Sequence, residues 1–199
     1  MNDIDLVSDH FARSIETTIA TEKSLSNRIA ETALIVQRTL NNGRKILTCG
    51  NGGSASDAQH LASELVCKYE YQRKALAAIA LSSDVALITA TGNDYDFSKI
   101  FSRQVDGLGK TGDMLIAIST SGKSENILMA VEKAIEKNIF VVGLTGKSGG
   151  QLGKIISEAK GLELRVPSEI VAHIQETHSI IIHCICKLVE LQTIGELSL

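Results

Sequence analysis

Histidine, carboxylate and amide side chains recur at helical spacing in two parts of this sequence. His60 and Glu64 are four residues apart, so they face the same side of a helix. An imidazole and a carboxylate in this arrangement can share a divalent metal or act as an acid–base pair. Gln175, His178 and His183 lie within an apolar run near the end of the sequence. A lone histidine in such a run is more often a hydrogen-bonded core residue, so the residues alone leave both interpretations open.

Hydroxyl side chains are concentrated in residues 119–124, which read Ser-Thr-Ser-Gly-Lys-Ser. A phosphate group is bound by several donors that converge on one point, and a helix N-terminus adds backbone N–H groups and a favourable dipole. Gly122 allows the backbone to approach closely. Hydroxyl-rich loops also form ordinary turns and helix caps. The position of this loop, after a buried apolar segment, favours a phosphate site.

A glycine-rich loop at residues 50–56, Gly-Asn-Gly-Gly-Ser-Ala-Ser, follows another apolar segment. It lacks the Gly-x-Gly-x-x-Gly spacing of dinucleotide-binding loops, and the sequence has no Gly-x-x-x-x-Gly-Lys-Ser/Thr motif. Asn51 with small neighbours suits sugar hydroxyls better than phosphate. The two loops together predict a phosphorylated small molecule as ligand, in preference to ATP or NAD.

Five short apolar segments predict the strands that position these loops, at residues 45–49, 77–81, 114–118, 140–144 and 162–166. Helical patterns lie between and after them, near 54–67, 84–91, 97–108, 124–137 and 168–191. Apolar strands that alternate with helices predict a parallel sheet covered on both faces. We therefore expect an α/β three-layer sandwich with a five-stranded parallel sheet, and ligands at the carboxyl ends of its strands.

Two amphipathic helices are predicted ahead of the first strand, at about 3–24 and 26–41, with Asn42-Gly43 as a stop. The sequence holds a single proline, Pro167, and no segment with linker composition. We expect one domain over 1–199, in which residues 1–42 pack on the core or on a partner subunit and 43–199 form the α/β core.

Composition excludes several classes of protein. The 199 residues carry a net charge of −3 without a basic block, which argues against nucleic-acid binding. No apolar run reaches the roughly 20 residues of a membrane span, and three aspartates interrupt the first ten residues where a signal peptide would be apolar. A cytoplasmic protein with reduced, mostly buried thiols is expected; its cysteines are Cys49, Cys67, Cys184 and Cys186.

The motifs in this order resemble those of phosphoheptose isomerases. The first signature is Cys-Gly-Asn-Gly-Gly-Ser-Ala-Ser-Asp-Ala-Gln-His at 49–60, followed by Glu64. The match continues at 92–95, 101–105, 118–122 and 174–178, and it spans nearly the whole sequence. The resemblance implies a SIS domain, which is flavodoxin-like, and a homotetramer. It also implies conversion of D-sedoheptulose 7-phosphate to D-glycero-D-manno-heptose 7-phosphate through an enediol, the first step of ADP-heptose biosynthesis for the lipopolysaccharide core or capsule.

Family residues carried over by matching position are all present. The resemblance implies one Zn²⁺ per subunit, with ligands at His60, Glu64, Gln175 and His183. It implies substrate contacts at Asn51, Gly52, Gly53, Glu64, Asn93, Asp94, Ser119, Thr120, Ser121, Ser124 and Gln175. We assign Glu64 as catalytic base and His183 as catalytic acid. One departure is His173, which stands where many members have arginine.

Two alternatives share this fold. One is a non-catalytic SIS adaptor that binds a replication initiator protein, and the other is a SIS isomerase of another sugar phosphate. Gly52-Gly53 with the complete ligand set favours the phosphoheptose isomerase. Gln175 and His183 are eight residues apart, about 12 Å of helix rise, which is far for two ligands of one metal with bonds of about 2 Å. Either the helix bends or a neighbouring subunit supplies one ligand; we favour an active site built between chains.

Overall fold

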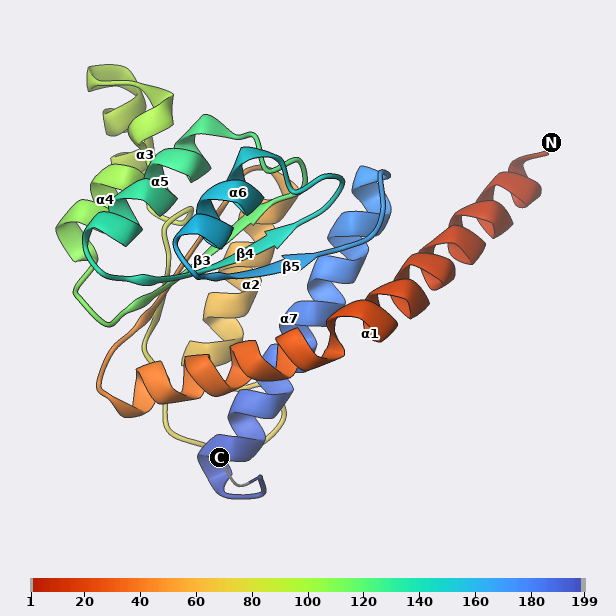
Figure 1. The fold of residues 1–199 in the computed structure, drawn as a ribbon, viewed down its shortest axis with the longest axis horizontal. Coiled ribbons are helices and arrows are strands. Elements are labelled where there is room, and N and C mark those ends of the chain that lie inside the picture. The colour runs from red at the N-terminus through yellow and green to blue at the C-terminus, as the bar shows by residue number, and fades with distance from the viewer. Residues whose placement is uncertain (1, 198–199) are drawn as a thin grey trace.

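The computed structural model describes residues 2–197, in which one parallel sheet has helices on both faces (Figure 1). The strand order is β2-β1-β3-β4-β5, and every neighbouring pair is parallel. The strands are β1 Ile46–Gly50, β2 Ala78–Ala80, β3 Met114–Ser119, β4 Phe140–Thr145 and β5 Leu162–Arg165. All five predicted strands and the predicted fold class are confirmed.

The central strands are buried on both faces because helices cover each side. Alternate residues of β3 enter opposite cores: Ile116 joins one hydrophobic cluster and Leu115 joins the other. One core packs on α1 Asp3–Asn41, α2 Gly53–Val66 and α7 Val171–Ile194. The other packs on α4 Ser102–Leu108, α5 Glu125–Glu136 and α6 Gly150–Glu158. These are the three layers of the predicted sandwich.

The winding of the sheet reverses between β1 and β3. From β1, the chain adds β2 on one side and then crosses to add β3 on the other. Loops on either side of such a switch point diverge and leave a crevice at the carboxyl ends of the strands. Both loops selected from the sequence start here, one after β1 and the other after β3.

The N-terminal region is one continuous helix, so the prediction of two helices is wrong. α1 runs for 39 residues from Asp3 to Asn41. Ser24 and Ser26, taken as a boundary, donate their hydroxyls to the carbonyls of Ala20 and Glu22 within the helix. Because no glycine or proline interrupts it, the helix continues. Its first half projects beyond the sheet (Figure 1) and leaves apolar side chains exposed, among them Ile4, Val7, Phe11, Ile15 and Ile19.

Three further elements differ from prediction. The 97–108 segment is divided into a 3₁₀ turn, Phe97–Lys99, and α4. The sequence pattern missed α6. The helix α3, Val85–Asp94, continues beyond its predicted end at residue 91. Within residues 2–197, no helix combines the length and apolar character that a membrane crossing needs.

The four cysteines are free, and only half of them are buried. Cys49 and Cys186 lie in the two cores, where burial raises the pKa of each thiol to about 12. Cys67 and Cys184 are exposed. The expectation of mostly buried thiols is therefore wrong for these two.

Candidate active site

The two loops at the switch point are joined by a reciprocal pair of amides. The side-chain nitrogen of Asn51 donates to the Asn126 oxygen at 2.8 Å, and the Asn126 nitrogen donates back at 2.9 Å. Asn51 follows β1, whereas Asn126 lies in the first turn of α5 and is buried. The pair holds the glycine-rich loop of residues 50–56 against the hydroxyl-rich loop of residues 119–124.

The glycines of the first loop are required by conformation and by space. Gly52 has φ +56°, in the left-handed region that L side chains avoid. A Cβ on Gly53 would lie 2.4 Å from the side-chain nitrogen of Gln175. The start of α2 and the Gln175 amide are therefore in close contact, which places Gln175 beside the first loop.

The hydroxyl-rich loop presents donors at the start of α5. Ser119 is buried, and its hydroxyl accepts from the Gly122 N–H at 3.2 Å and lies 3.4 Å from the Ser124 hydroxyl. Ser121 accepts from the Lys123 N–H. Ser124 occupies the N-cap of α5, but its side chain caps no backbone N–H. The first N–H groups of this helix are thus open to an anion.

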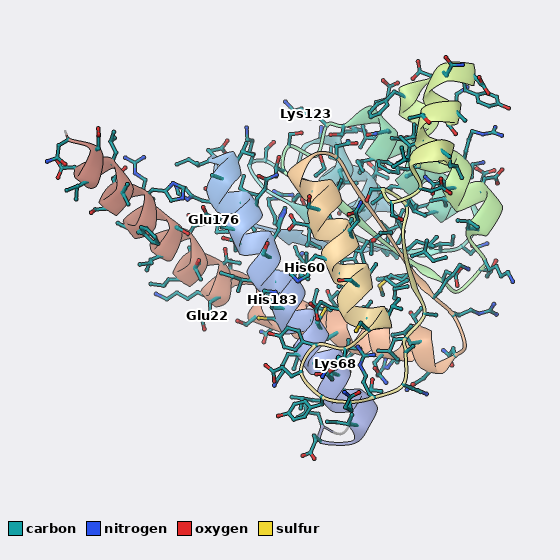
Figure 2. The ribbon with its side chains drawn as sticks, turned by 180° about the vertical axis from the view of Figure 1, so that it is seen from behind. Glu22, His60, Lys68, Lys123, Glu176 and His183 are labelled. Carbon is teal, nitrogen blue, oxygen red and sulfur yellow. The ribbon has the colours of Figure 1, made fainter. Side chains whose placement is uncertain are left out.

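Three of the four predicted metal ligands lie close together further along α2 and α7, away from the two loops. The Nε2 atoms of His60 and His183 are 3.3 Å apart, and the rings are perpendicular. His60 Nε2 also lies 3.4 Å from a Glu64 carboxylate oxygen. Figure 2 shows His60 and His183 facing each other from the two neighbouring helices. All three side chains are partly exposed, so solvent and small molecules reach them.

Gln175 does not join this cluster within one chain. α2 and α7 run side by side in the same direction, with contacts at Gly53–Gln175, Asp57–Ser179 and His60–His183. Gln175 therefore lies level with Gly53, seven residues or about 10 Å of rise before His60. The single chain brings together His60, Glu64 and His183 and separates Gln175 from them.

A buried carboxylate holds the C-terminal parts of α2 and α7 together. Glu190 of α7 is fully buried and accepts the backbone N–H groups of Tyr69, Glu70 and Tyr71. Arg73, 3.4 Å from Glu190, donates to the last carbonyls of α2, including that of Glu64 at 2.6 Å. This network caps α2 at its C-terminus and fastens it to α7. It also sets the Tyr69 ring 5.7 Å from that of His183.

Asn93 and Asp94 stand apart from the loops. They lie at the exposed end of α3, where the Asn93 amide donates to Asp94 at 2.8 Å. Among residues 2–197, no hydrogen bond or ion pair connects them to either loop. The structure therefore does not bring these two predicted contacts into the site.

His178 is a core residue, as its apolar sequence context allowed. Its Nε2 faces the Thr145 carbonyl at 3.0 Å, and burial lowers its pKa to about 4. The ring is therefore neutral near pH 7 and serves the packing of α7 on β4.

Two residues of the site were missed in the sequence. Asn126 follows the hydroxyl-rich loop directly, and its place in the first turn of a helix was the available signal. Asp57 lies one turn before His60 on α2 and is buried; one oxygen accepts from Ser179 at 3.2 Å and the other has no partner among the described residues. Burial raises the pKa of Asp57. Along the two helices, the Asp57 carboxyl therefore lies between Gln175 and the pair His60 and His183.

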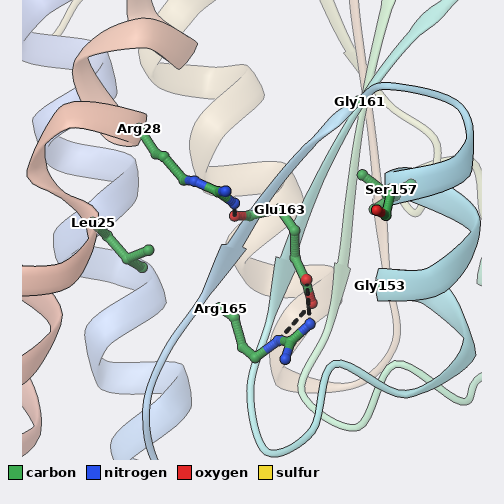
Figure 3. A pocket seen from close by; sticks show the side chains of 8 residues that line it. Leu25, Arg28, Gly153, Ser157, Gly161, Glu163 and Arg165 are labelled. Atoms are coloured by element: carbon green, nitrogen blue, oxygen red, sulfur yellow. Dashed lines mark hydrogen bonds and ion pairs between the residues drawn. The ribbon is translucent and has the colours of Figure 1, made fainter.

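A cavity of about 450 Å³ lies elsewhere, between α1, α6 and β5 (Figure 3). Each of its charged side chains has a hydrogen-bond partner. The Glu163 carboxylate accepts from Arg165 and Thr145, and Arg28 donates to the Glu163 carbonyl. None of the predicted site residues lines it.

The histidine cluster fits a zinc ion in its donor set. Two imidazoles and one carboxylate are common zinc ligands. In a tetrahedral site with bonds of about 2.0–2.1 Å, neighbouring ligand atoms are about 3.3 Å apart. The two separations around His60, 3.3 and 3.4 Å, agree with this value. The three side chains do not yet bring one donor atom each within 4.8 Å of one another, so a bound ion would need Glu64 or His183 to move inward.

Comparisons with known proteins agree with this architecture. Residues 9–146 match the family model of the SIS domain. A phosphoheptose isomerase of Shewanella denitrificans is 48% identical over 183 residues, 92% of this chain and 93% of that protein. The solved phosphoheptose isomerase of Francisella tularensis is 46% identical, with a TM-score of 0.92 over 96% of this chain and 99% of its own. That of Neisseria gonorrhoeae is 41% identical, with a TM-score of 0.89 over 94% and 98%. The chain therefore belongs to the phosphoheptose isomerase family of SIS-domain proteins and is an isomerase.

Proposed function

We propose that this enzyme converts D-sedoheptulose 7-phosphate to D-glycero-D-manno-heptose 7-phosphate through an enediol. The observation that carries the proposal is that His60 lies close to both Glu64 and His183. These residues belong to two helices, one of which starts at the glycine-rich loop of residues 50–56. The names and coverage of the relatives support the same substrate class. We further propose that the reaction is the first step of ADP-heptose biosynthesis and takes place in the cytoplasm, without nucleic-acid or membrane partners.

The hydroxyl-rich loop is proposed to bind the phosphate. Ser119, Thr120, Ser121 and Ser124 supply hydroxyls, and the uncapped start of α5 supplies backbone N–H groups. The sugar hydroxyls are assigned to the first loop, Asn51 to Gly53, and to Gln175 beside it. Asn93 and Asp94 are proposed as further contacts, which requires the end of α3 to approach the ligand.

Isomerisation moves a proton between C1 and C2 and exchanges protons on their oxygens. Glu64 is proposed as the base at carbon, because α2 fixes a carboxylate whose side chain is open to a ligand. His183 is proposed as the acid at oxygen, since imidazole is the side chain best suited to give and take protons near neutral pH.

Zn²⁺, one per subunit, is the proposed cofactor. His60, Glu64 and His183 would hold it, with Gln175 as the fourth ligand carried over from the family. The ion would supply Lewis-acid polarisation of the substrate carbonyl. A ligating side chain is less free to carry a proton, so the ligand and acid–base roles of Glu64 and His183 alternate in this proposal.

A homotetramer is proposed as the active form. Gln175 is about 10 Å from the histidine level in one chain, so a complete ligand set needs a second subunit. The exposed apolar side chains on the first half of α1 provide a surface for association. Light scattering with parallel assays tests this, and a fully active monomer would refute it.

The reaction is tested by NMR of purified protein with sedoheptulose 7-phosphate, with and without a chelator. We expect aldose signals with the 7-phosphate and much slower conversion of unphosphorylated sedoheptulose. Chelation is expected to slow turnover, with recovery on adding Zn²⁺. No conversion would favour the adaptor interpretation, and preferred conversion of a hexulose or amino-sugar phosphate would identify another SIS isomerase.

A further inference from the structure

His10, His173 and Glu176 form a second cluster of ligand-type side chains, between α1 and α7. His10 Nε2 lies 2.7 Å from one Glu176 oxygen, and His173 Nδ1 lies 3.3 Å from the other. The two imidazole rings have centroids 4.6 Å apart. One donor atom from each side chain falls in a group within 4.8 Å of one another. Figure 2 shows Glu176 on α7 at the side that faces α1.

The cluster is distinct from the histidine pair of the proposed active site. Glu176 and His183 are seven residues apart on α7, about 10 Å of rise. Glu176 contacts α1, whereas the neighbouring Gln175 contacts the start of α2. The two sets therefore occupy different levels of the same helix, and Glu176 reaches α1 whereas His183 reaches α2.

The charge and support of the cluster suit a cation. The Ser14 hydroxyl donates to a Glu176 oxygen at 2.7 Å, and the two imidazoles face the same carboxylate. Ser14 orients it in the way that outer-shell donors orient metal ligands.

Burial divides the cluster into a fixed part and an adjustable part. The His173 side chain is 3% exposed and held within the helix packing, whereas His10 and Glu176 are 48% and 40% exposed. A tetrahedral zinc site needs ligand atoms about 3.3 Å apart. The His173–Glu176 separation of 3.3 Å already has that value, and the exposed side chains of His10 and Glu176 have room to adjust around the buried imidazole.

We propose that His10, His173 and Glu176 bind a divalent transition-metal ion of the zinc class and so clasp α1 to α7. The set of two imidazoles and one carboxylate is one that Zn²⁺ accepts. The clasp acts ahead of Thr17, the first buried residue of α1. It therefore anchors the projecting half of the helix, which the core does not hold.

The test measures metal stoichiometry, so it does not depend on the proposed isomerase reaction. The full chain with His60→Ala and His183→Ala is stripped with a chelator and titrated with Zn²⁺ by calorimetry. Co²⁺ is titrated in parallel and followed by visible absorption. We expect one equivalent to bind per chain. Adding His10→Ala or Glu176→Gln should weaken binding at least tenfold, whereas adding Glu16→Gln, at an exposed carboxylate on α1, should not.

Thermal unfolding gives a second readout. Zn²⁺ should raise the Tm of the starting double variant and leave that of the His10→Ala triple variant unchanged. Circular dichroism establishes that each variant is folded. A folded double variant that binds no metal, or one whose affinity is unaffected by His10→Ala, would overturn the proposal and leave a hydrogen-bonded network only.

Discussion

The carboxamides of Asn51 and Asn126 bond to each other in both directions, at 2.8 and 2.9 Å, across 75 positions of sequence. Each amide spends one donor and its acceptor on the other, so the relative position of the two ligand loops is set before any substrate binds. This arrangement reduces the cost of ordering the loops on binding.

Removing this amide pair should affect binding and stability together. Asn126→Ala leaves the half-buried Asn51 amide without its partner, at a cost of about 1–3 kcal/mol. We expect a raised KM and a lower free energy of unfolding in urea. Asn51→Ala and the double variant complete a double-mutant cycle. Additive losses in the cycle would show that the two amides do not act as a pair.

Two glycine substitutions should affect different properties, one the activity and the other the stability. A Cβ on Gly53 meets the end of the flexible Gln175 side chain, which can move away. Gly53→Ala should therefore keep the fold and reduce kcat/KM by displacing Gln175. A Cβ on Gly122 would lie 1.9 Å from the Gly149 carbonyl oxygen, and its φ is +62°. Gly122→Ala should instead lower Tm strongly, because backbone must shift. Equal Tm values for the two variants would contradict this contrast.

Ser124→Ala should raise KM for the sugar phosphate by roughly 10- to 100-fold, with a smaller change in kcat. A hydrogen bond to a charged group contributes about 1.5–3 kcal/mol, and phosphate lies far from the reacting carbons, so its loss is mainly uniform binding. Ser124 is the cleanest of the hydroxyls to remove because it caps no N–H of α5. Ser26→Ala, at an exposed position on α1, is the control. An unchanged KM would move the phosphate elsewhere.

Glu64→Gln keeps the size of the side chain and removes its basicity. We expect an intact fold and assembly, retained sugar-phosphate binding, and at least about 10²-fold slower turnover. The measurement is solvent deuterium exchange into C1 of the substrate. Glu132→Gln, at an exposed carboxylate on α5, should exchange at the wild-type rate. Wild-type exchange in Glu64→Gln would assign the carbon base to another residue.

Stability should fall in acid through Glu190. Burial alone would raise its pKa, but three backbone N–H groups and Arg73 outweigh burial and hold it below the ordinary 4.5. The stabilisation that ionised Glu190 gives the folded state is therefore complete above pH 4.5 and is lost as the pH falls through the folded pKa. Glu190→Gln should cost about 3 kcal/mol near neutral pH and show a flatter acid limb of unfolding free energy. Parallel pH curves for the two proteins would refute this assignment.

Much of the fold was predictable because strands buried on both faces are apolar throughout. Residues 114–118 and 140–144 show this directly, and glycine-rich or hydroxyl-rich loops mark where such strands end. α6 was missed because Gly150 and Gly153 lie inside it, and glycine normally argues against a helix. The division of α1 was wrong because serine hydroxyls can bond within a helix as well as cap one.

The site was predictable where ligands share one helix and not where they meet across elements. His60 and Glu64 belong to one helical face, so their spacing was informative. The facing of His60 and His183 depends on how α2 packs on α7, which no local pattern encodes. Asn126 and His10 are similar cases, since their partners are 75 and 166 positions away.

The packing of α1 against α7 also bears on how the protein is made. Gln37 and Thr193, which bond across these helices, are 156 residues apart. A ribosome synthesises α1 first and α7 last, so the long helix waits for its partner until nearly all of this sequence has emerged. Contacts of such separation slow folding because loop-closure entropy must be met before they form. Until α7 has been synthesised, the apolar residues of α1 that pack against it, such as Leu25 and Ile29, lack the partner that buries them.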